Sequence, residues 1–147
     1  MDFTETLLAW YMEHRRELPW QSGTNPYYIW VSEIILQQTR VSQGLEYYHR
    51  FIAAFPTVQD LARAKEDEVL KVWQGLGYYS RARNMHRTAQ TVADSYGGVF
   101  PREVDQLKKL RGIGPYTAAA VASFAFKRPV AALDGNGYRI LARFFGL

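Results

Sequence analysis

A short glycine turn between two helical stretches constrains the fold of this chain more than any other feature. Gly112 and Gly114 flank Ile113, and Pro115 follows at the position where proline favours the first turn of a helix. Glycine allows a sharp turn and a close approach to a ligand, and the N–H groups that open the next helix suit an anion. Three neighbouring cations favour a nucleic-acid phosphate as that anion: Lys108, Lys109 and Arg111. Taken alone, the turn could equally be an ordinary connection between two helices.

The composition is that of a soluble globular protein with some preference for nucleic acid. Of the 147 residues, 48% are hydrophobic and 22% are charged, and the formal net charge is +4. The chain has no cysteine, which excludes a disulfide or a thiolate metal site, and we expect no metal within it. No apolar run approaches the roughly 20 residues that a membrane span needs. We therefore expect a soluble, cytoplasmic protein that does not bind membranes.

Helical spacing dominates the chain, and no stretch alternates with the period of a strand. We predict a compact all-α protein of about nine or ten short helices without a domain linker. Thr4 and Thr6 can cap a first helix, which ends before Leu18. The later helices are predicted at about 26–38, 41–55, a short stretch after 57, 64–73, 79–96, a short stretch within 101–110, 115–126 and 137–147.

Two carboxylates have mostly apolar neighbours in the sequence. At Glu33, desolvation would raise the pKa and make the side chain a proton donor near neutral pH. The alternative is a glutamate on the solvent-facing side of an amphipathic helix. Asp134 follows an apolar stretch and can also be the N-cap of the next helix. Cleavage of a glycosidic bond uses such a pair, one acid to protonate the leaving group and one carboxylate to stabilise an oxocarbenium-like centre.

The sequence resembles the helix–hairpin–helix DNA glycosylases, and within them the adenine glycosylases of the MutY type. The resemblance covers nearly all of the chain and implies a six-helix barrel that includes the hairpin. The segments that carry it are LPW at 18–20, WVSEIILQQTRV at 30–41, FPTVQDLA at 55–62, WQGLGYYSRARN at 73–84, LRGIGPYTAAAV at 110–121 and LDGNGYRILAR at 133–143.

This resemblance implies roles for the candidate catalytic residues. Glu33 would protonate adenine N7 and later handle water, and Asp134 would stabilise the sugar C1′ or bond to it transiently. Tyr116 would close the pocket beside Asp134, with Asn136 as a nearby polar partner. Relatives that also cleave the DNA strand, such as endonuclease III, carry a lysine at the position of Tyr116, and its amine forms a Schiff base. Since a phenol cannot do so, we predict a monofunctional enzyme.

The resemblance also implies that two loops enter the DNA, with Gln38 as the wedge where the base leaves and Tyr78 inserted beside 8-oxoguanine. The alternatives are a polar helix terminus at the first loop and a core aromatic residue at the second. The contacts of Arg81, Arg83 and Arg87 on the next helix stay open. The residues that we expect to bind DNA are Gln37, Gln38, Thr39, Tyr78, Gly112, Gly114 and Arg111.

The chain departs from the resembled family in extent. Family members carry four cysteines that hold a 4Fe-4S cluster, and a second domain that helps to recognise 8-oxoguanine. We therefore expect a catalytic fragment, with the barrel at about 21–134, the helix–hairpin–helix at about 105–126, and residues 1–20 and 135–147 in a partial, cluster-side helical domain. An open cleft in this fragment would leave Glu33 more solvated and the fragment with little or no activity. Exposed apolar faces on the end helices could make it self-associate.

The implied function is base-excision repair by hydrolysis of the N-glycosidic bond of adenine opposite 8-oxoguanine or guanine. The expected partner is double-stranded DNA with such a mispair. The full-length protein is expected to be a monomer with a 4Fe-4S cluster, acting at the nucleoid in a bacterial cytoplasm. Two alternatives are a thymine-mismatch glycosylase of the same fold and a non-catalytic DNA-binding module. The module would need neither Glu33 nor Asp134, because phosphate binding uses neither.

Overall fold

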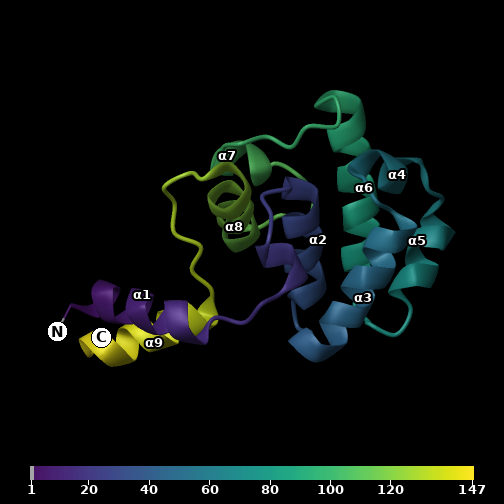
Figure 1. Cartoon of the computed structure of the whole chain (residues 1–147). Coiled ribbons are helices and arrows are strands. Elements are labelled where there is room, and N and C mark those ends of the chain that lie inside the picture. The colour runs from purple at the N-terminus through teal and green to yellow at the C-terminus, as the bar shows by residue number, and fades with distance from the viewer. Residues whose placement is uncertain (1) are drawn as a thin grey trace.

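The computed structural model describes residues 2–147, and all regular structure within them is helical (Figure 1). The all-α prediction is confirmed, and most predicted boundaries lie close to the observed ones. The elements are α1 (Phe3–His14), the 3-10 turn η1 (Pro19–Gln21), α2 (Pro26–Leu36), α3 (Val41–Ala54), α4 (Val58–Arg63), α5 (Glu66–Trp73), α6 (Ser80–Ser95), α7 (Val104–Leu107), α8 (Pro115–Phe126) and α9 (Gly135–Phe145).

Two local predictions were wrong. The N-cap of α1 is Asp2, whose carboxylate accepts hydrogen bonds from the N–H groups of Thr4 at 2.8 Å and Glu5 at 3.2 Å. A carboxylate can cap as well as a hydroxyl, and Asp2 precedes both threonines. The first helix of the hairpin is also shorter than predicted, because after α7 the chain continues in turns up to Gly112. The basic residues before the glycines therefore lie in the turn itself.

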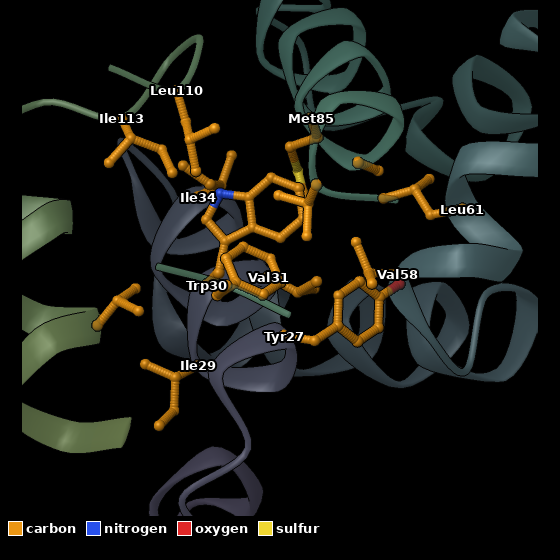
Figure 2. Packing of buried hydrophobic residues seen from close by; sticks show 14 of the residues in the cluster. Tyr27, Ile29, Trp30, Val31, Ile34, Val58, Leu61, Met85, Leu110 and Ile113 are labelled. Carbon is orange, nitrogen blue, oxygen red and sulfur yellow. The ribbon is translucent and has the colours of Figure 1, made fainter. Parts of the chain in front are cut away.

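The buried helix α2 lies at the centre of the fold and packs against η1, α3 and α8. Asn25 caps it by accepting a hydrogen bond from the Tyr27 N–H at 2.9 Å, and Pro26 opens its first turn. Most of its residues are buried, which is typical of a helix that is apolar nearly all round. Figure 2 shows Trp30 and Ile34 of α2 beside Leu110 and Ile113 of the hairpin turn. The core thus fixes the hairpin relative to α2.

Small side chains surround the buried part of α8, which packs against α2 and α7. Residues 117–122 are buried, and four of these six are alanines. Alanine allows the backbones of two packed helices to approach closely, since the distance between helix axes depends on the side chains at the contact. This packing against α2 brings the first turn of α8, with Tyr116, to the middle of α2, with Glu33.

The first and last helices lie side by side, apart from the body of the molecule (Figure 1). The ring of Phe3 lies 4.7 Å from that of Phe144 and 5.7 Å from that of Phe145, measured between centroids. Phe144 and Phe145 nevertheless remain at least half exposed. The predicted self-association through these faces stays a prediction. Within residues 2–147, no helix has the length and apolar character needed to cross a membrane.

Candidate active site

Glu33 lies on α2 at the wall of a cavity of about 440 Å³. Burial raises the pKa of its carboxyl to about 7; the negative charge of Asp134 acts in the same direction, while hydrogen bonding from Tyr116 opposes it. This confirms the predicted desolvation of Glu33. The expectation that an open cleft leaves Glu33 more solvated here than in a longer chain stays a prediction. Tyr11 of α1 and Trp20 of η1 line the same cavity.

Tyr116 occupies the first turn of α8 and lines the same cavity. Burial raises its pKa to about 12, and the negative charges of Glu33 and Asp134 add to this effect. The phenol therefore stays protonated at neutral pH and can only donate or accept a hydrogen bond there. Such a neutral donor can favour the ionised form of Glu33 without adding charge to the site.

Asp134 is the N-cap of α9, as predicted. Its carboxylate accepts a hydrogen bond from the Gly137 N–H at 2.8 Å, and the Asn136 side-chain amide lies 3.4 Å from its other oxygen. The side-chain oxygen of Asn136 in turn accepts a hydrogen bond from the Arg139 guanidinium. Asp134 is exposed, yet its charge acts on both Glu33 and Tyr116. The structure thus brings three of the four predicted catalytic residues together, with Asn136 beside the third.

The cavity has the size and wall chemistry of a site for a planar organic group. Its volume falls within the roughly 300–1,000 Å³ of typical small-molecule sites. Four aromatic side chains form part of its wall, and polar side chains line the rest together with Gly23 and Ile29: the lining residues are Tyr11, Trp20, Gln21, Gly23, Ile29, Ser32, Glu33, Tyr116, Phe124 and Lys127. One acid that is half protonated near pH 7 and a second carboxylate nearby can perform acid–base chemistry on a bound group.

The two loops predicted to enter DNA both contain a residue with left-handed backbone. Gln38 follows the end of α2 with φ 58°, and Tyr78 precedes α6 with φ 48°. Tyr78 is 64% exposed, so the alternative of a core aromatic residue is wrong for the described structure. Gln37 reaches Thr117 of α8 with its side-chain amide at 3.4 Å, and the Thr39 hydroxyl contacts the Gln37 carbonyl. Their contacts with DNA stay predictions.

Arg81 joins these two loops, and sequence reasoning left its contacts open. Its guanidinium donates hydrogen bonds to backbone carbonyls at the end of α2, including that of Gln37. In the sequence it stands with Arg83 and Arg87 on one helix, which is equally typical of a solvated face. Only the contacts of the folded structure distinguish Arg81 from these two arginines, because no local sequence pattern does.

At the hairpin, only one of the two glycines requires glycine for its conformation. Gly112 has φ +76°, and a Cβ there would lie 3.0 Å from the Cβ of Asn84. Gly114 has φ −84°, which any residue adopts, and a Cβ there would meet no atom within 4 Å. The Asn84 side chain also accepts a hydrogen bond from Arg111 Nε at 3.0 Å. The turn is therefore tied to α6 through Asn84, with open space outside Gly114.

The chain does not fit an iron–sulfur cluster. It contains no cysteine, and among residues 2–147 no three His, Asp or Glu side chains are placed to hold a metal ion. Thiolates are the usual ligands of such clusters. Any cluster ligand would have to come from other residues.

Comparison with known proteins places this geometry in a family. An adenine DNA glycosylase from Buchnera aphidicola (subspecies Baizongia pistaciae) is 44% identical over 146 residues, which is 99% of this chain and 42% of that protein. A solved thermostable thymine-DNA glycosylase has a TM-score of 0.92 and 32% identity, over 99% of this chain and 67% of its own. Endonuclease III, solved as a trapped covalent intermediate with DNA, has a TM-score of 0.81 and 26% identity, over 92% and 63% of the two chains.

The match to the family is broad, although the chain spans about two fifths of the first of these relatives. Residues 31–147 match the HhH-GPD superfamily of base excision DNA repair proteins, a stretch that contains Glu33, Tyr116, Asp134, both loops and the hairpin but not the part of the cavity wall formed by residues 11–29. The nine α-helices and the hairpin found among residues 2–147 agree with that assignment. This chain belongs to the HhH-GPD superfamily of base excision DNA repair proteins.

Proposed function

We propose that this chain carries the catalytic site of a monofunctional adenine DNA glycosylase that acts on adenine opposite 8-oxoguanine or guanine. The observation that carries the proposal is Glu33, with a pKa of about 7, in a cavity beside Tyr116 and within range of the charge of Asp134. Identity of 44% to an adenine DNA glycosylase supports adenine over thymine as the base, since identity to the thymine-DNA glycosylase is 32%.

In the proposed reaction, Glu33 in its protonated form delivers a proton to N7 of the extruded adenine. The C1′–N9 bond then breaks, and its electron pair stays with adenine. Asp134 stabilises the positive charge that develops at C1′. The ionised Glu33 next accepts a proton from the water that attacks C1′, which restores its protonated form. Tyr116, neutral throughout, orients the Glu33 carboxyl and contributes no nucleophile.

The proposed partner is double-stranded DNA, held in part by the hairpin turn. Gly114 leaves open space for a phosphate at the start of α8, and Arg111, three residues earlier, donates a hydrogen bond to Asn84 of α6. Gln38 and Tyr78 are the proposed residues that fill the space left by the extruded base. We further propose that α2 to α8 form the barrel, that α1 and α9 belong to a second helical layer, and that a 4Fe-4S cluster, if the protein has one, is held by residues outside these 147. A monomer at the bacterial nucleoid is the proposed working state.

The experiment compares release of the free base from three duplexes: adenine opposite 8-oxoguanine, adenine opposite guanine, and thymine opposite guanine. It uses the 147-residue chain and any longer chain that contains it, each beside its Glu33→Gln variant. We expect the longer chain to release adenine from the first two duplexes and its variant to release none, and we expect little or no release by the 147-residue chain. Release of thymine alone would overturn the choice of base. Tight binding of all duplexes with no release from the longer chain would favour a DNA-binding module.

A further inference from the structure

Arg81 contacts two separate turns of the backbone with one guanidinium group. Its Nη1 donates to the carbonyl of Ile34 at 2.9 Å and to that of Gln37, both at the end of α2. Its Nη2 lies 3.4 Å from the carbonyl of Gly77, in the loop before α6. Gln37 directly precedes Gln38, and Gly77 directly precedes Tyr78. The same side chain is therefore bonded next to both residues that we propose to enter DNA.

Packing also holds the guanidinium in one orientation. Its Cζ lies 5.1 Å from the centroid of the buried Trp73 ring and 5.8 Å from that of the Tyr78 ring. Among the ion pairs of residues 2–147, none involves Arg81. Its positive charge is instead stabilised by the backbone carbonyls at the C-terminal, negative end of the α2 dipole. Arg81 is thus part of the architecture of the two turns, unlike Arg83, which forms an exposed pair with Glu66.

The backbone at both turns needs such support. Gln38 and Tyr78 are two of only three non-glycine residues with positive φ among residues 2–147. Side chains other than glycine rarely adopt this conformation, and it persists where surrounding contacts hold it. Arg81 donates to the carbonyl immediately before each of the two residues. Loss of these bonds removes a contact from both turns at once.

We propose that Arg81 is a positioning residue that fixes the wedge turn (residues 37–39) and the Tyr78 loop (residues 77–79) at one mutual distance, so that both enter the duplex together. This inference rests on the proposed function, because it takes Gln38 and Tyr78 as the entering residues. The guanidinium of arginine is planar and holds several N–H donors in fixed directions, so it can bridge the carbonyls of two loops. Lysine has the same charge, but it is a point donor on a flexible stem and cannot keep this geometry.

The test compares Arg81→Lys with the matched control Arg83→Lys on the same helix. Base extrusion is followed by the fluorescence of 2-aminopurine placed next to the target adenine, and excision is measured in single turnover. Since misplacement of about 1 Å can lower rates up to about a hundredfold, we expect Arg81→Lys to lose about tenfold or more in extrusion and excision. Affinity for a fully paired duplex should stay unchanged, and Arg83→Lys should behave as the parent does. Parent-like extrusion and excision in Arg81→Lys would overturn the inference.

Two further measurements separate a positioning role from general destabilisation. Amide hydrogen exchange without DNA should accelerate at residues 37–39 and 77–79 in Arg81→Lys and remain slow in the core of α6. The effects of Arg81→Lys and Gln38→Ala on extrusion should be less than additive, because the first variant already misplaces the residue that the second removes. Uniformly faster exchange, or full additivity, would contradict the role. If Arg81→Lys does not fold, Arg81→Gln, which keeps a neutral donor, takes its place.

These outcomes also separate the inference from the proposed function. If the parent protein releases no base from any duplex, the proposed function fails, whereas the exchange data still decide whether Arg81 holds the two turns. If the parent releases adenine and the exchange of both turns is unchanged in Arg81→Lys, the inference fails and the proposed function stands.

Discussion

The Tyr116 hydroxyl and the Glu33 carboxyl act on each other's ionisation in opposite directions. Tyr116 lowers the pKa of Glu33 by hydrogen bonding, while the charge of Glu33 raises the pKa of Tyr116. The Asp134 carboxylate raises both pKa values by repulsion. The pKa of Glu33 is therefore set by a balance. Burial and the Asp134 carboxylate raise it, and the hydrogen bond from the Tyr116 phenol lowers it.

This balance predicts that two neighbouring substitutions shift the pKa of Glu33 in opposite directions. Tyr116→Phe removes the group that lowers it, so the pKa of Glu33 should rise above about 7. Asp134→Asn removes the repulsive charge, so the pKa should fall. Carbon-13 NMR titration of the glutamate side-chain carboxyls, with Glu33→Gln to assign the signal, measures both. Shifts in the same direction would refute this account of the site.

Glu33→Gln should abolish excision and flatten the dependence of stability on pH. An amide cannot deliver the proton. For stability, the folded-state pKa of about 7 lies above the ordinary value of 4.5, so the folded state prefers the protonated acid. Protonated Glu33 therefore stabilises the folded state fully below about pH 4.5, and this stabilisation is lost as the pH rises through about 7. At about 1.4 kcal/mol per pKa unit, the loss in the free energy of unfolding is about 3 kcal/mol.

Urea unfolding at a series of pH values between 5 and 8 checks the second part. The parent should lose stability across this range by more than Glu33→Gln does, and binding of a fully paired duplex should be nearly equal in both. Two parallel curves would show that Glu33 is not desolvated in solution. Excision at a rate near that of the parent would show that another group supplies the proton.

Tyr116→Lys should introduce Schiff-base chemistry that the parent lacks. Position 116 lies in the first turn of α8 at the wall of the cavity, where an amine could reach a sugar aldehyde. Borohydride should then trap a covalent adduct between the variant and DNA that contains an abasic site. The parent, with a phenol whose pKa is about 12, should give no adduct through this residue. Efficient trapping by the parent would mean that a native lysine reaches the sugar, and Lys127, which lines the same cavity, would be the first to replace.

The hairpin glycines should give different results when substituted. Gly114→Ala meets no neighbouring atom and no strained φ, so the fold should persist while binding weakens alike for matched and mismatched duplexes. Gly112→Val forces a branched residue to φ +76° and against Asn84, which should lower stability by about 1–3 kcal/mol as well. Thermal melting and salt-dependent binding separate the two effects. Loss confined to the mispaired duplex in Gly114→Ala would contradict a phosphate contact.

Helix positions could be predicted from the sequence because their signals are local. Pro26 and Pro115 begin helices, Thr57 caps α4 through a capping box, and Asp134 caps α9. Glu33 could also be found, since a carboxylate in an apolar run has few explanations other than function. The cap at Asp2 was missed because three polar residues near the start of the chain compete for the same role.

What the sequence could not predict depends on distant contacts. The bond of Arg81 to the Ile34 carbonyl spans 47 positions in the chain, and that of Gln37 to Thr117 spans 80. Tyr11 and Trp20 line the Glu33 cavity from 22 and 13 positions earlier in the chain, and no helical or strand periodicity of the sequence relates them to Glu33. The left-handed backbone at Gln38 and Tyr78 is likewise invisible in sequence, because neither residue is a type that favours it.

The alanine face of α8 has a consequence for how acid strength in this protein can change over evolution. Ala118, Ala120 and Ala122 are fully buried, and their small volume allows α8 to lie close to α2. A larger side chain at a position of α8 that contacts α2 would push the two helices apart, since a packed core does not absorb extra methylenes without backbone shifts. The separation of Tyr116 from Glu33 would then grow, although no charged or polar residue had changed. Substitutions at buried, uncharged positions that do not contact a substrate can therefore change the pKa of Glu33.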